Sequence, residues 1–169
     1  ENYHGWLNYL FGNIEEAMNS LDVEFPPHLK AEVIFTEYIT YYSLTLLAQY
    51  NTSDSQEEDL QKLAENQELM QIWAHHAPMN FQYRYELVEA EKARVLGETL
   101  QAMDFYDAAI NGAKENGFIQ YVALANELAG EFYLELGREK IAQTYLAEAH
   151  YAYRRWGANA KVKHLENQY

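Results

Sequence analysis

A helical pattern returns along this chain after 40 residues, and it constrains the fold more than any other feature of the sequence. When residues 91–117 are aligned with residues 131–157, six positions are identical: Glu91/Glu131, Leu96/Leu136, Gly97/Gly137, Ala102/Ala142, Ala109/Ala149 and Gly117/Gly157. Each copy reads as a helix, a glycine turn, a second helix and a glycine stop. Because such a unit cannot bury its apolar face alone, units stack on their neighbours. The sequence therefore predicts an all-α fold of antiparallel helix-pair repeats, with a period of about 40 residues, that form a short right-handed solenoid.

The spacing of apolar residues predicts helices along the whole chain, and glycine and proline stand between the helical runs. We expect one helical-repeat domain over residues 1–169 that is itself a fragment of a longer protein. Its expected parts are a degraded or truncated repeat at 1–25, a long helix pair at 26–80, a repeat at 81–120, a repeat at 121–157 and the start of a further helix at 158–169. The polar run 51–59 is the clearest connector, and Ser55 with Glu58 matches the capping-box pattern of a helix start. Gly97, Gly117 and Gly137 are expected just past helix ends.

The composition favours a protein partner. The chain has 26 acidic and 12 basic side chains, which give a net charge of −14. A surface with this charge repels phosphate backbones and anionic lipids, so we expect neither nucleic-acid nor membrane binding. The chain has no cysteine, and no apolar run approaches the roughly 20 residues of a membrane span. We therefore expect a cytoplasmic protein with protein partners, and the composition leaves homo-oligomer formation open.

The second copy of the repeat resembles the tetratricopeptide repeat. In that pattern, small residues alternate with larger ones at fixed spacing, here Gly130, Tyr133, Gly137, Ala142, Leu146 and Ala149. The same spacing holds Ala90, Ala93, Gly97, Ala102, Tyr106 and Ala109 in the first copy, and Gly5, Gly12, Ala17 and Leu21 in a degraded copy. Small side chains let two helix axes approach closely, while the larger residue fills the groove opposite. The period of 40 residues, against about 34 in the standard unit, predicts longer helices.

Residues 66–169 are similar to one segment of very large bacterial sensor kinases. The most specific runs are WAHHAPMNF at 73–81 and ENGFIQYVALANELAGEFYLELG at 115–137. In those proteins a serine/threonine-kinase-like domain and an AAA-like ATPase module precede a helical-repeat region, and a GAF domain and usually a histidine kinase follow it. The resemblance implies that this chain is the carboxy-terminal part of that repeat region. The parent would be a serine/threonine and/or histidine kinase, but no kinase or phosphate-loop motif lies in this chain.

The histidines and glutamates of the chain suggest no chemistry. His28 lacks the glycine that follows the lysine in histidine-phosphotransfer runs, because Ala31 follows Lys30. The adjacent His75 and His76 point about 100° apart on a helix, so we expect them to cap and pack a helix end. Only Glu1–His4 has the Glu-x-x-His spacing of carboxylate-bound metals, and Glu148 and His150 face differently. We expect a solvated acidic face from Glu57, Glu58, Glu86, Glu89 and Glu91, and no catalytic, cofactor-binding or metal-binding residues.

The expected function is recognition by a non-catalytic scaffold that links the ATPase-like and GAF/kinase modules. Repeats of this type present the first helix of each unit to a ligand, so the expected interaction surface consists of Tyr83, Arg84, Lys92, Asn126 and Tyr133. The fifteen tyrosines suit either helix packing or an exposed binding surface. Two alternatives stay open: a small-ligand sensor with an aromatic-rich pocket, and a helical-bundle enzyme with a histidine/carboxylate site.

Overall fold

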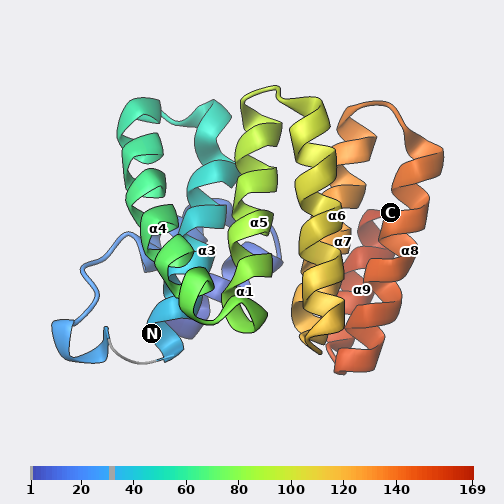
Figure 1. Ribbon diagram of the computed structural model, residues 1–169. Helices are drawn as coiled ribbons and strands as arrows, with labels where there is room; N and C mark the ends of the chain where they lie inside the picture. Colours follow the sequence, from blue (N-terminus) through green and yellow to red (C-terminus); the bar gives the residue numbers. More distant parts are fainter. Residues whose placement is uncertain (1, 31–32) are drawn as a thin grey trace. The chain divides into compact units, whose positions relative to one another are not determined.

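A computed structural model of the chain describes residues 2–30 and 33–169. These residues form nine α-helices and two short 3-10 helices, with no strand among them, which confirms the all-α prediction (Figure 1). The chain divides into two compact units, Glu1–His76 and Ala77–Tyr169. The division falls close to position 80, where the sequence predicts the end of a long helix pair.

The first unit is built around one nearly uncharged helix. Its helices are α1 (Asn2–Leu10), α2 (Ile14–Leu21), α3 (Val33–Gln49) and α4 (Gln56–His76). Helix α3 contacts α1, α2 and α4, and most of its side chains are buried. The Tyr38 hydroxyl lies 2.9 Å from the backbone carbonyls of both Leu21 and Val23, so it ties the end of α2 to α3.

Proline and serine set the boundaries inside the first unit. A 3-10 turn at Pro27–Leu29 precedes α3, and positions 31–32 lie outside the described residues. The polar connector ends at Gln56, close to the predicted start of the next helix. The side-chain contact recorded there uses Ser53, whose hydroxyl accepts from the Ser55 amide at 3.1 Å and donates to Asp59 at 2.6 Å.

The second unit is a row of paired helices. Its members are α5 (Pro78–Val95), α6 (Thr99–Glu115), α7 (Ile119–Glu135), α8 (Glu139–Trp156) and α9 (Asn159–Gln168). Helix α5 packs on α6, α7 on α8, α6 on α7, and α9 on α8, and Figure 1 shows neighbours running in opposite directions. The turns close at glycines with φ between 71° and 85°, as their positions after helix ends predicted. At a residue such as Gly117, the positive φ favours glycine because residues with an L side chain rarely adopt this backbone conformation.

One close contact between paired helices occurs in both units. A Cβ atom built on Gly130 of α7 would lie 2.6 Å from Cγ of Leu146 on α8. In the first unit, a Cβ atom on Gly5 would lie 2.6 Å from Cγ of Leu21. The two pairs have the same spacing along the chain, as the tetratricopeptide-like alignment of these glycines and leucines predicts. This agreement supports the close approach of paired helices, while the repeat array and its right-handed course remain predictions.

None of the helices among the described residues combines the length and the hydrophobicity that a bilayer span requires.

Candidate functional site

The five residues predicted to form an interaction surface are mostly interior residues. Tyr83, Arg84, Asn126 and Tyr133 are between 1% and 5% exposed, and Lys92 is partly buried. We therefore correct the expectation that the first four residues are exposed. A role in binding a partner stays a prediction for Lys92, which keeps part of its side chain in solvent.

Aromatic packing explains the burial of the first two residues. The Tyr83 ring on α5 contacts the rings of Phe118 and Tyr121, with centroids 5.0 and 5.2 Å apart. The guanidinium of Arg84 lies 5.0 Å from the Tyr121 centroid, which is a cation–π contact. Arg84, which the sequence predicts to be a surface residue, is therefore buried where α5 packs against α7.

Tyr133 is part of a polar aromatic stack between the helices α6, α7 and α8. Its ring stacks on Tyr145 at 5.1 Å with an interplanar angle of 19°. The Tyr145 hydroxyl donates a hydrogen bond of 2.6 Å to Asp107 on α6. Burial and the Asp107 carboxylate raise the pKa of Tyr145 above that of an ordinary tyrosine. The stack therefore stays uncharged at neutral pH and serves packing.

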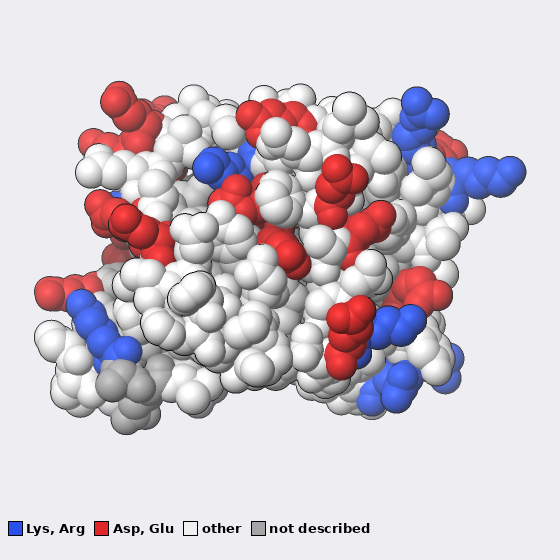
Figure 2. All heavy atoms as spheres, viewed as in Figure 1, with Lys and Arg blue, Asp and Glu red and all other residues white. Residues whose placement is uncertain are grey.

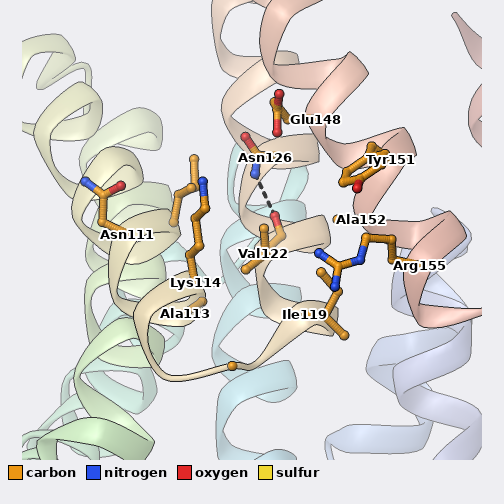
Figure 3. Close-up of a pocket in the computed structure, with 12 residues that line it drawn as sticks. Asn111, Ala113, Lys114, Ile119, Val122, Asn126, Glu148, Tyr151, Ala152 and Arg155 are labelled. Carbon is orange, nitrogen blue, oxygen red and sulfur yellow. Dashed lines mark hydrogen bonds between the residues drawn. The ribbon is translucent and has the colours of Figure 1, made fainter.

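Among the five residues of the predicted interaction surface, Asn126 lines a groove. The groove has a volume of about 450 Å³ and is formed by the last turns of α6, the first half of α7 and the second half of α8 (Figure 3). The Asn126 amide donates to the Val122 carbonyl at 2.8 Å, and its oxygen points the other way, toward the groove. The volume falls within the range of about 300–1,000 Å³ that is typical of ligand sites.

The groove combines an apolar floor with charged walls. Ile119 and Val122 of α7 line it between Lys114 on α6 and Arg155 on α8. Figure 3 shows the Arg155 guanidinium directed toward the two apolar side chains, with the Lys114 side chain extending on the opposite wall. Across the part of the chain that the structure describes, no ion pair joins either cation to a carboxylate. Glu148 adds one negative charge to the lining.

No pattern in the sequence singles out Lys114 and Arg155. Each stands in the last turn of its helix, where basic residues are common because they interact favourably with the helix dipole. Lys114 and Arg155 line the same groove because of the way three helices pack. The spacing of residues within one helix does not predict this packing. Figure 2 shows acidic side chains across the visible face, with basic side chains gathered on the side of the second unit where α8 lies.

A second polar cluster joins α7 to α8 and α9. The Lys161 ammonium lies 2.7 Å from Glu127, and the Tyr153 hydroxyl donates to the same carboxylate at 2.5 Å. Both partners of the ion pair are at most 5% exposed. Such a buried pair is costly to break, because the remaining charge loses its partner. The cluster therefore holds the last helix against the rest of the second unit.

Glu91 departs most from the predicted solvated acidic face, of which Glu57 and Glu58 are exposed and Glu86 and Glu89 partly buried. Glu91 on α5 is only 3% exposed and accepts a hydrogen bond of 2.6 Å from Arg94. Burial raises the pKa of Glu91, and Arg94 works in the opposite direction. The expectation that Glu91 is solvated is therefore wrong. Arg94, one helical turn away, offsets the free-energy cost of burying the Glu91 carboxylate.

One histidine, His164, lies beside the second polar cluster, with its Nδ1 atom 3.4 Å from the Lys161 ammonium. His75 and His76 stand exposed at the end of α4 with ring centroids 5.5 Å apart, and His150 pairs with Glu166 of α9 at 2.8 Å. Glu1 of the Glu1–His4 pair lies outside the described residues. Residues 2–30 and 33–169 contain no group of three or more histidine, aspartate or glutamate side chains placed to hold a metal ion.

Glu131 makes the stability of the chain depend on pH. Burial and the nearby Glu127 carboxylate raise the pKa of Glu131 to about 7, although the Tyr169 hydroxyl, which donates to it at 2.8 Å, lowers the pKa. Because its folded-state pKa exceeds the ordinary value of 4.5, the folded chain binds more protons between pH 4.5 and 7. The stability that Glu131 contributes is therefore present at low pH and is lost as the pH rises through this window.

We expect Glu131→Gln to remove this loss. Between pH 5 and pH 8 the original chain should lose about 2 kcal/mol more unfolding free energy than the variant, measured by urea denaturation. Glu139→Gln, which changes an exposed acid on α8, is the control and should leave the pH profile unchanged. Parallel profiles for Glu131→Gln and the original chain would contradict the assignment.

The comparisons with known proteins give one partial relative. A segment of 57 residues, 34% of this chain, is 39% identical to hybrid signal transduction histidine kinase G of Dictyostelium discoideum. The match spans only 2% of the length of that kinase. No family model and no solved structure matches the chain. The chain thus has an all-helical fold in its described residues and a partial, distant similarity to a signal-transduction histidine kinase, and the resemblance to bacterial sensor kinases stays a prediction.

Proposed function

We propose that this chain is a tetratricopeptide-like helical-repeat region of a multi-domain signal-transduction kinase, where it acts as a non-catalytic protein-interaction scaffold. The observation that carries the proposal is the similarity to a hybrid histidine kinase, joined to a fold made of paired helices. In a right-handed array of such pairs, each pair contacts mainly its neighbours, so the array can hold attached modules at a set spacing. The partners would be the neighbouring ATPase-like and GAF modules of the same protein, or an outside regulator.

Two features of the described residues support a scaffold. The interior of the second unit is filled by aromatic and small side chains, including the Tyr83–Tyr121 contact and the Gly130–Leu146 approach. The polar clusters are internally paired, as the Glu127–Lys161 bond shows. Such packing favours a rigid body that presents surfaces over one that rearranges around a reaction.

Calorimetric titration of the chain with the parent's adjacent ATPase-like and GAF modules tests the proposal. We expect saturable binding of at least one module, with light scattering to report the stoichiometry. Absence of heat with both modules, from a chain shown to be folded by circular dichroism, would count against an intramolecular scaffold. Lys92→Glu serves as a first surface variant, because Lys92 is the predicted contact that keeps solvent exposure.

A small-ligand sensor is the second candidate, and the groove of about 450 Å³ favours it. A ligand bound only by the folded chain raises the unfolding temperature by mass action. Stabilisation of several degrees by one compound class in a thermal-shift screen would therefore favour a sensor. A divalent cation that bound tightly and stoichiometrically in calorimetry would instead revive the enzyme alternative.

A further inference from the structure

We propose that the groove between α6, α7 and α8 binds an acidic, apolar segment of a partner protein, with a carboxylate held between Lys114 and Arg155 and an aliphatic side chain against Ile119 and Val122. This inference rests on the proposed scaffold function and names the chemistry of one partner contact. It places that contact on residues outside the interaction surface that the sequence predicts.

The first argument for this inference is the charge of the groove. Lys114 and Arg155 stand on opposite walls, and no described carboxylate pairs with either side chain. The nearest recorded contact of Arg155 is the ring of Tyr151, whose centroid lies 5.8 Å away. An arginine that rests on an aromatic face keeps its donors available for a carboxylate, which it can bind with two parallel hydrogen bonds.

The second argument is the chemistry of the floor and of the far end of the groove. Ile119 and Val122 are half-buried, so an aliphatic side chain placed on them would remove apolar surface from water. Farther along the groove, the Asn126 oxygen of α7 and the Glu148 carboxylate of α8 offer acceptors, which suit the amide donors of a peptide backbone. The lining therefore matches a peptide that begins with a negative charge and continues with apolar residues.

The net charge of the chain disfavours some classes of ligand for the groove. A chain with a net charge of −14 repels a polyphosphate or a nucleic acid at long range. A short segment with one or two carboxylates meets less of this repulsion and still gains the local attraction of two cations. This difference favours an acidic protein segment over a nucleic acid as the occupant.

Fluorescence anisotropy with a short labelled peptide that begins with one glutamate and continues with leucines tests the inference on the full chain. We expect saturable binding that weakens as salt rises, because the attraction of exposed charges is screened. The charge reversal Lys114→Glu with Arg155→Glu should weaken binding at least 10-fold. Lys114→Gln with Arg155→Gln should give a smaller loss, and it keeps the test valid if the reversed pair perturbs folding.

A matched variant separates the groove from general charge. Lys140→Glu with Arg154→Glu makes the same change in net charge at exposed positions on α8 outside the groove lining, and it should leave the affinity within about twofold. Equal weakening by both reversals, or no saturable binding of the peptide, would overturn the inference. If the parent's modules bind the original chain and the Lys114/Arg155 reversal equally well, the groove inference fails while the scaffold proposal stands.

Discussion

Replacing Gly130 by alanine is expected to lower the free energy of unfolding by about 2 kcal/mol, although alanine is a better helix former than glycine. The added methyl group would lie 2.6 Å from Cγ and 2.7 Å from Cδ2 of Leu146, and the Ala142 carbonyl closes the space at 3.4 Å. Since these atoms cannot all withdraw without moving α8, the overpacking outweighs the propensity gain of about 1 kcal/mol. Urea denaturation followed by circular dichroism measures the change.

The sign of this effect should reverse when Leu146 is shortened. In a Leu146→Ala background the methyl group enters vacated space, and Gly130→Ala should stabilise the chain by about 0.5–1 kcal/mol. Gly112→Ala on α6 is a graded comparison, because its Cβ atom would lie 3.1 Å from Cβ of Tyr83, and a smaller cost is expected. A destabilisation that persists in the Leu146→Ala background would show that the close approach is not the cause.

Replacing Lys161 by methionine is expected to cost about 3 kcal/mol and to loosen α9. The change keeps most of the side-chain volume but leaves the Glu127 carboxylate buried without its cation, which lies 2.7 Å away in the intact chain. Hydrogen exchange should show faster exchange of the α9 amides, and urea denaturation gives the total loss.

Two further variants test whether the loss comes from the orphaned charge. Adding Glu127→Gln to Lys161→Met should restore much of the stability, because the neutral amide can still accept from the Tyr153 hydroxyl. Lys163→Met, on the same helix at an exposed position, should change the stability by less than about 0.5 kcal/mol. A double variant as unstable as Lys161→Met alone would show that packing, rather than charge, holds α9.

The helices and their boundaries could be predicted from the sequence because local chemistry determines them. Glycines such as Gly97 and Gly137 adopt positive φ just past helix ends, as their positions in the sequence predict. The small residues at the contacts between paired helices were also found correctly, since Gly130 faces Leu146 as the alignment implied.

Which polar residues are buried could not be predicted, because burial depends on partners from other helices. Arg84 reads as a surface cation, yet the Tyr121 ring of α7 holds its guanidinium inside. Tyr133 reads as an exposed aromatic, yet Tyr145 of α8 covers it. The candidate groove was missed for the same reason, since it joins residues of three helices that share no periodic pattern. Asn126, which was predicted from its place on the first helix of a unit, lines the groove, and its part in binding a partner stays a prediction.

The turn glycines have open surroundings, so only the handedness of the backbone limits which residue can stand there. A Cβ atom on Gly117 or Gly137 meets no atom within 4 Å, so the turn excludes side chains only through its positive φ. The mirror-image amino acids prefer that backbone region, and a D-alanine would fit there without displacing a neighbour. Chemical synthesis could therefore stiffen each turn by changing chirality alone, while the packed helices on either side keep their contacts.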